Sequence, residues 1–108
     1  MSEIEFSAGR CWGGRRVATT IADLSPRQRL VVTGTISSTR TFPLGSGVAY
    51  ACVLADGTGE IGLVFLGRPS VPGLITGARC TVEGTARLVE GGLVVWNPRY
   101  RFEAEASL

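Results

Sequence analysis

Hydrophobic and polar residues alternate along several short stretches of this chain, which is the pattern of strands with one buried face. The clearest alternation runs from Ala78 to Val89. Arg29 to Ser37 (RLVVTGTIS) and Leu93 to Phe102 (LVVWNPRYRF) are also rich in β-branched residues, and the turns between such stretches contain Gly or Pro. We therefore predict a strand over each of these three stretches.

Two further strands flank the segment Asp56-Gly57-Thr58-Gly59. Gly57 and Gly59 supply the positive φ values that a tight hairpin needs, and Asp56 can accept hydrogen bonds from the turn amides. The residues on either side, from Cys52 and up to Phe65, are largely apolar. The sequence thus predicts a central hairpin in which Asp56 caps the turn.

Five strands within about 75 residues predict a small barrel. The segment from Gly67 to Gly77, between strands three and four, contains Pro69 and Pro72 and permits one helical turn at most. The predicted fold class is all-β: a five-stranded Greek-key OB-fold barrel with a short helical or loop segment between strands three and four. Because Pro98 cannot donate to a ladder, we expect incomplete closure near it.

The alternation also predicts which side chains fill the barrel. Arg79 and Arg87 should face solvent, since a register slip of one residue would exchange the two faces. Gly34 and Gly84 are expected to mark bends in their strands. The inward set is Leu30, Val32, Ile36, Tyr50, Cys52, Leu54, Ile61, Leu63, Phe65, Cys80, Val82, Ala86 and Val95.

Length and composition favour one domain. A chain of 108 residues with 44% hydrophobic content can form a single core. We expect an N-terminal arm or extension over residues 1–24, the OB-fold domain over 25–103 and a C-terminal tail over 104–108. No apolar run is long enough to cross a membrane and the first residues are acidic, so we expect a cytoplasmic protein without membrane contact.

The arm has two interpretations. It is either a tail with Trp12 folded back on the barrel, or a segment that folds over nucleic acid with Trp12 stacking and Arg10, Arg15 and Arg16 meeting phosphates. Ala18 to Leu24 is expected to form a short helix or strand.

Three sequence segments carry a family resemblance: IADLSPRQRLVVTGTI, CVLADGTGEIGLVFLGR and VPGLITGARCTVEGTARLVEGGLVVWNPRY. Together they cover about residues 20 to 102 and resemble the anticodon-binding type of OB domain. That type occurs in some aminoacyl-tRNA synthetases, in the bacterial replicative polymerase and in the wedge domain of branched-DNA helicases. The chain looks most like the stand-alone OB-fold proteins of high-GC Gram-positive (actinobacterial) species, and this resemblance implies nucleic-acid binding.

The residue types needed for catalysis are nearly absent. The sequence has no histidine, no phosphate-binding loop and no serine-hydrolase motif, and its carboxylates are not paired. Three cysteines without C-x-x-C spacing predict neither a zinc site nor a disulfide framework, so Cys52 and Cys80 are interpreted as core residues. We predict a binding module that is not an enzyme and has no cofactor and no metal.

Charge supports nucleic-acid binding only through position. All eleven basic residues are arginine, against nine carboxylates. The arginine fork pairs with phosphate and stacks on bases, although a GC-rich genome also favours arginine. The loops and central strands of an OB fold form its ligand surface. There we expect Arg40 and Phe42 in the loop between strands one and two, Arg68 after strand three, Arg87 before the next loop, and Trp96, Arg99, Tyr100 and Arg101 on or just beyond strand five.

The outward face of the central strands does not fit a base-stacking surface. By phase it would hold Val31, Thr33, Thr35, Ala49, Ala51, Val53, Gly62, Val64 and Leu66, with no ring and no charge. Two functions therefore remain open. One is weak, largely sequence-independent binding of single-stranded DNA or RNA or of structured nucleic acid, and the other is a protein–protein adaptor or a self-associating (homo-oligomeric) module.

Overall fold

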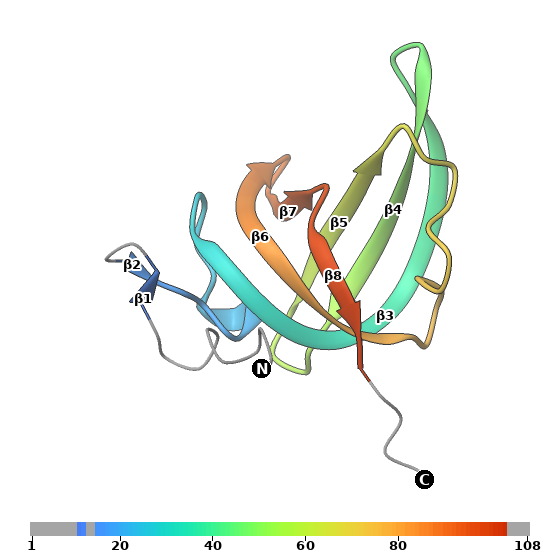
Figure 1. The fold of residues 1–108 in the computed structure, drawn as a ribbon. Coiled ribbons are helices and arrows are strands. Elements are labelled where there is room, and N and C mark those ends of the chain that lie inside the picture. The colour runs from blue at the N-terminus through green and yellow to red at the C-terminus, as the bar shows by residue number, and fades with distance from the viewer. Residues whose placement is uncertain (1–10, 13–14, 104–108) are drawn as a thin grey trace, which may run out of the picture.

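The computed structural model describes residues 11–12 and 15–103, and within them strand is the main secondary structure (Figure 1). A short antiparallel pair, β1 (Cys11–Trp12) and β2 (Arg15–Arg16), is followed by a 3-10 helix at Ile21–Asp23. Six strands then form one sheet: β3 (Arg29–Leu44), β4 (Gly47–Ala55), β5 (Glu60–Leu66), β6 (Arg79–Val89), β7 (Gly92–Trp96) and β8 (Arg99–Phe102).

The sheet closes into the predicted five-stranded barrel. Its strand order is β3-β4-β5-β7-β6-β8, and an additional pairing of β3 with β6 joins the ends of the five-strand ring. All neighbours are antiparallel except β5 and β7, which run parallel. Among the described strands, β8 pairs only with β6, and it extends the sheet beyond the ring.

The expected fifth strand is divided, and the expectation of incomplete closure is wrong. Pro98 separates β7 from β8, and both pair with β6. Closure is achieved before the proline, because Gly62, Leu63 and Val64 of β5 pair with the residues of β7.

Strand β3 is longer than predicted, which corrects the placement of Arg40 and Phe42. We expected it to end at Ser37, but it continues to Leu44 along β4. A β-bulge makes this possible: Ile36 pairs with Leu54 and Ser38 with Val53, so the residue between them has no partner and the strand bends there. Arg40 and Phe42 therefore lie on the strand and not in a loop.

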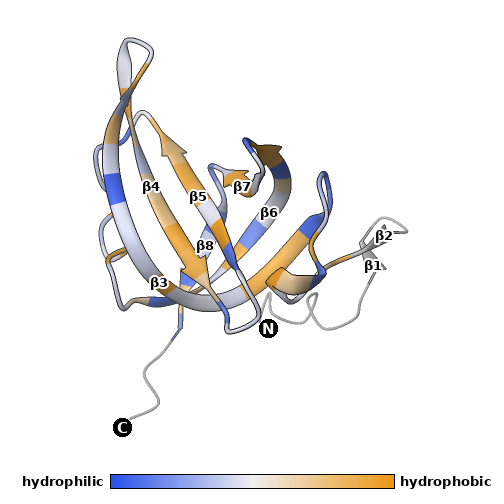
Figure 2. Ribbon diagram, turned by 180° about the vertical axis from the view of Figure 1, so that it is seen from behind, coloured by the Kyte–Doolittle hydropathy of each residue, from blue (hydrophilic) through white to orange (hydrophobic). Residues whose placement is uncertain are grey.

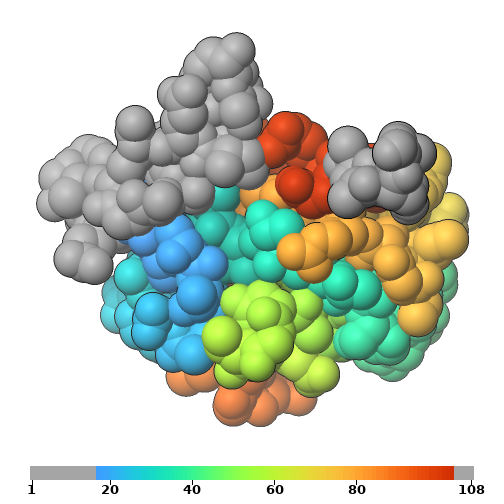
Figure 3. Space-filling model, turned by 90° about the horizontal axis from the view of Figure 1, so that it is seen from below, coloured from blue at the N-terminus to red at the C-terminus, as the bar shows by residue number. Residues whose placement is uncertain are grey.

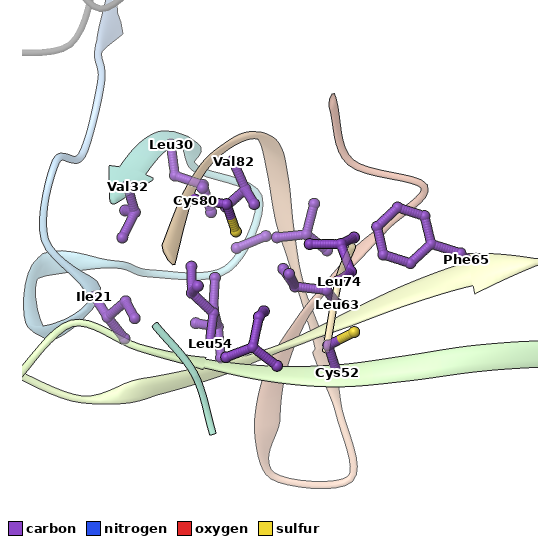
Figure 4. Close-up of a cluster of buried hydrophobic side chains, with 14 of the residues drawn as sticks. Ile21, Leu30, Val32, Cys52, Leu54, Leu63, Phe65, Leu74, Cys80 and Val82 are labelled. Carbon is purple, nitrogen blue, oxygen red and sulfur yellow. The ribbon is translucent and has the colours of Figure 1, made fainter. Parts of the chain in front are cut away.

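The core contains the predicted inward side chains, and Figure 4 shows part of this cluster. Every residue of the inward set is buried, and Arg79 and Arg87 are exposed. The connection after β5 contains no helix; Val71 and Leu74 of this connection are buried in the core instead, and the Tyr50 hydroxyl donates to the Leu74 carbonyl at 2.7 Å. Ala18 and Ile21 also join the core, so the packed part of the chain begins before residue 25.

Gly34 and Gly84 are needed because neighbouring atoms approach them closely. A Cβ at Gly34 would lie 2.5 Å from the Ala55 carbonyl oxygen, and one at Gly84 would lie 2.5 Å from Val95 Cγ1. The bends expected at these two glycines stay predictions, while the register shift in β3 lies at the bulge after Ile36. These two glycines thus allow β3 and β6 to pack against their neighbours.

The β4–β5 turn does more than reverse the chain. Asp56 Oδ1 accepts hydrogen bonds from the Thr58 amide (2.8 Å), the Thr58 hydroxyl (2.6 Å) and the Gly59 amide (3.2 Å), which confirms its role as a turn cap. Its Oδ2 accepts from the Ile21 amide at 2.9 Å, and the Thr58 oxygen accepts from the Ala22 amide at 3.0 Å. The turn therefore caps the 3-10 helix as well, and Figure 3 shows the two segments in contact.

These contacts set the pKa of Asp56. Partial burial of the carboxyl raises its pKa, but the hydrogen bonds from Thr58, Ile21 and Gly59 together outweigh this and leave the pKa below its ordinary value. A group with a lowered pKa in the folded state stabilises the fold above its unfolded-state pKa, and this contribution disappears as pH falls through the folded-state value.

Replacing Asp56 by Ala should lower the free energy of unfolding at pH 7 by about 1–2 kcal/mol, because four donors lose their acceptor. Urea unfolding followed by circular dichroism measures this. Glu60→Ala, at an exposed position on the same hairpin, is the matched control and should change little. Asp56→Asn should also lower the free energy of unfolding relative to wild type. This difference should become smaller as the pH falls below about 4, because the wild-type carboxylate then becomes protonated. A difference in the free energy of unfolding that did not change with pH would show that the negative charge of Asp56 does not stabilise the turn.

Cys52 and Cys80 should be unreactive in the folded protein. Burial, reinforced for Cys52 by Cys80 and for Cys80 by Glu103, raises the pKa of each thiol to about 11. Only about 0.1% of each would be thiolate at pH 8, and the thiolate is the reacting form. In a Cys11→Ser variant, a thiol reagent should therefore label neither cysteine until urea is added. Rapid labelling of the folded protein would show that the core opens readily.

Candidate nucleic-acid interface

The register of the sheet places charged and aromatic side chains beside the apolar outer face. Paired residues on neighbouring strands share a face, so a row of side chains can be followed across the sheet. One row is Arg40 on β3, Ala51 on β4, Val64 on β5 and Trp96 on β7. The chain thus provides a guanidinium at one edge of this row and an indole at the other.

Two parallel rows extend this outer face. The first row runs from Ser38 on β3 across the sheet to Arg87 on β6, so Arg87 lies at the same edge as Trp96. The second row begins at Phe42 on β3, so Phe42 lies at the same edge as Arg40. The Arg40 guanidinium lies over the Phe42 ring at 4.7 Å from its centroid. The two rows are Ser38, Val53, Gly62, Val94 and Arg87, and Phe42, Ala49 and Leu66.

The continuous exposed apolar strip expected from the sequence is absent. β4 and β5 are strongly hydrophobic (Figure 2), but Ala49 and Val64 are buried on their outer side and Val31 is buried as well. Larger neighbours in the rows account for part of this: Ala49 lies between Phe42 and Leu66, and Val64 pairs with Trp96. Of the expected strip, Leu66 is the large residue left exposed, at 42%.

A pocket of about 310 Å³ adjoins this face where β7 and β8 separate. The pairing of β7 with β6 ends at Val95, and β8 returns to β6 where Arg99 pairs with Glu83. The floor between them is formed by Gly84, which has no side-chain carbon, and Thr85, whose side chain is small. The walls are Arg29, Glu83, Arg87, Trp96, Asn97 and Arg99.

The electrostatics of the pocket depend on Glu83. Its side chain is only 9% exposed, and its Oε2 accepts a hydrogen bond from Arg29 Nη2 at 2.7 Å. Arg99 Nε lies 3.8 Å from the other oxygen, Oε1, which is too long for a hydrogen bond. Arg87 forms no ion pair within the described part of the chain. Among the described residues, three guanidiniums and one carboxylate line the pocket, so this lining carries a net positive charge.

Asn97 fixes the wall that carries Trp96. Its backbone is left-handed (φ 49°), its amide donates to the Val64 carbonyl at 2.6 Å, and its side-chain oxygen accepts from the Leu66 amide at 2.9 Å. Asparagine adopts this conformation more readily than most residues. These two bonds continue the β5–β7 ladder past Trp96 and hold the indole at the rim of the pocket.

The structure places five of the eight residues expected at the site on the outer face or its pocket, in two separate groups. Arg40 and Phe42 lie at one edge of the outer face, and Arg87, Trp96 and Arg99 lie around the pocket at the other. Arg68 is exposed in the connection after β5. Arg101 lies on β8 beyond the pocket, and its Nη2 is 3.7 Å from Glu103 Oε2. The side chain of Tyr100 points away from the site.

Tyr100 packs on the core side. It pairs with Val82, an inward residue, and its ring makes edge contacts with Phe65 (5.8 Å) and Phe102 (5.7 Å). Arg99 and Tyr100 are adjacent in the chain and so face opposite sides of β8. Sequence reasoning missed Arg29, Glu83 and Asn97, because only the β3–β6 register and the break at Pro98 reveal that they meet.

Comparison with known proteins identifies the fold. No family model and no curated protein matches the chain. Among solved structures, it is similar to the OB domain of Ta0387 from Thermoplasma acidophilum, with a TM-score of 0.65 at 17% identity, covering 85% of this chain and 92% of that domain. The chain has the OB fold.

The chain is also similar to parts of two other solved proteins, RecG and replication protein A. One is RecG bound to a three-way DNA junction (TM-score 0.67, 21% identity, 81% of this chain), of which this OB domain spans only 12%. The other is the second OB-fold domain of replication protein A from Methanococcus maripaludis (TM-score 0.57, 18% identity, 81% of this chain and 95% of that one). The likeness establishes architecture, and function requires a separate argument from the site.

Other expectations lie beyond what the structure describes. Arg10 is outside the described residues, as is the tail over 104–108, and the role of the N-terminal arm stays a prediction. No helix in residues 11–12 and 15–103 is long and apolar enough to span a membrane. The same residues contain no group of three or more potential metal-ligating side chains.

Val64→Arg should destabilise the fold by about 1–3 kcal/mol, because position 64 is buried on the outer side and a charge there must be desolvated or displace its neighbours. Leu66→Arg, on the same strand and face but exposed, should stay within about 0.5 kcal/mol of wild type. Urea unfolding measures both. Equal, small effects would show that the face is open at Val64 as well.

Proposed function

We propose that this OB domain is a non-enzymatic module that binds single-stranded nucleic acid weakly, across its outer face. The observation that carries the proposal is the arrangement of the rows. Arg40 and Phe42 stand at one edge of an apolar surface, and Trp96 and Arg87 stand at the other. The similarity to OB domains of RecG and replication protein A supports a nucleic-acid ligand.

The rings provide stacking platforms. Trp96 is 39% exposed, enough to offer part of its ring to a base, and a base–aromatic stack is worth about 1–3 kcal/mol. Phe42 is half-buried beneath the Arg40 guanidinium, so a base at that edge stacks on the arginine plane or replaces it. Ala51 and Val53, which are half-buried between the two edges, provide apolar contact without hydrogen-bonding groups.

The arginines limit the affinity. The net charge of the chain is +2, and Glu83 offsets part of the positive charge in the pocket. Arg40, Arg87 and Arg99 can each neutralise about one phosphate, which gives a salt slope of about −2 for single strands. We therefore expect dissociation constants in the micromolar range or weaker, on DNA or RNA.

Trp96→Ala should weaken binding by about 1–3 kcal/mol, and Arg87→Ala should weaken it and reduce the salt slope by about 0.7. Fluorescence anisotropy with a labelled 12-nucleotide single strand at 50–200 mM salt measures both. Arg79→Ala is the matched control: it removes the same charge from the same strand, at the opposite end of β6.

Two outcomes would contradict the proposal. Equal losses for Arg79→Ala and Arg87→Ala would show a general charge effect without a defined surface. No binding by wild-type protein at high micromolar concentration and 50 mM salt would remove the nucleic-acid function, and the protein–protein adaptor would take its place.

A further inference from the structure

The pocket beside Trp96 contains a group that an ordinary phosphate-binding surface does not need. Three arginines would attract phosphate by themselves, but the wall also carries the Glu83 carboxylate, which repels anions. The side chain of Glu83 is nine-tenths buried. A buried carboxylate at a nucleic-acid site is better suited to a base edge than to the backbone.

The two carboxylate oxygens of Glu83 have different surroundings. Oε2 is held by Arg29 at 2.7 Å, which fixes the orientation of the carboxylate. Oε1 has one charged neighbour among the described residues, Arg99 Nε at 3.8 Å, beyond hydrogen-bond range. Oε1 therefore retains acceptor capacity, and Glu83 lines the same pocket as Trp96.

We infer that this pocket holds one unstacked base of a bound single strand and selects for a base with an exocyclic amine. Trp96 stacks on the base, Glu83 Oε1 accepts from its amine, and Arg87 and Arg99 meet the flanking phosphates. Gly84 and Thr85 leave the floor open for the ring. This inference rests on the proposed function and adds a specificity that the apolar rows do not have.

Cytosine and uracil provide a matched pair of ligands. Cytosine presents an N4 amine where uracil presents the O4 carbonyl, and carboxylates accept from cytosine N4. A carbonyl facing Glu83 would bring two acceptors together and leave the carboxylate oxygen without a donor. The pocket should therefore favour cytosine and discriminate against uracil at this one position.

The test compares oligo-dC and oligo-dU of 12 nucleotides on the full chain by anisotropy, at one salt concentration and a pH of 7.5. Wild type should bind oligo-dC at least about fivefold more tightly than oligo-dU. Glu83→Gln should bring this ratio close to one, because an amide can present either its oxygen or its NH₂ group to the base. Glu90→Gln, an exposed carboxylate in the β6–β7 turn, is the control and should preserve the ratio.

A second variant covers the case in which Glu83→Gln fails to fold after losing its ion pairs. Thr85→Tyr fills the floor of the pocket from a half-exposed position and leaves Glu83 and its arginines in place. It should also bring the dC:dU ratio close to one while retaining part of the affinity.

The outcomes separate this inference from the proposed function. Binding of both oligomers by wild type with equal affinity, or tighter binding of oligo-dU, would overturn the base pocket and leave the general interface intact. Absence of binding to either oligomer would overturn both. A preference for oligo-dC that survives both Glu83→Gln and Thr85→Tyr would place the discrimination elsewhere and overturn the assignment to this pocket.

Discussion

The parallel pairing of β5 with β7 is the contact on which both the barrel and the candidate interface depend. Three residue pairs make it: Gly62 with Val94, Leu63 with Val95, and Val64 with Trp96. The middle pair is inward and joins the core, whereas the outer pairs set the rows of the exposed face. Gly62 permits the close approach, because a Cβ there would lie 3.3 Å from Val94 Cγ2. The same short ladder therefore closes the barrel and places Trp96.

The end of that ladder explains the pocket. Pro98 cannot continue the pairing, and Asn97 replaces the lost ladder bonds by donating to Val64 and accepting from Leu66. The chain is unpaired with β6 from Trp96 to Pro98 and returns to it at Arg99. Gly84 lies on β6 beneath this gap. A Cβ at this position would lie only 2.5 Å from Val95 Cγ1. The missing pairing between Val95 and Arg99 coincides with the pocket, and charged residues surround it.

Local sequence determined most of the fold but less of the site. Alternation along β6 and the chemistry of Asp56 and Gly57 were sufficient to predict the register, the core and the central turn. The bulge after Ile36 could not be predicted, since nothing in the sequence at Ser37 requires it, yet it allows β3 to carry Arg40 and Phe42 along β4. The direction of Tyr100 was also missed, because the break at Pro98 hid which face β8 presents to β6.

Whether a part of the outer face can select a base depends on whether its side chains can form hydrogen bonds. Ala51, Val53 and Gly62, the half-buried residues at the centre of the face, carry no polar side-chain atoms, so this part of the face can contact any base equally. Phosphate pairing by arginine carries no sequence information either. Any specificity must therefore come from the edge where the face meets a polar group of fixed orientation. Glu83, held by Arg29 and nearly removed from solvent, is the residue in the pocket that meets this requirement.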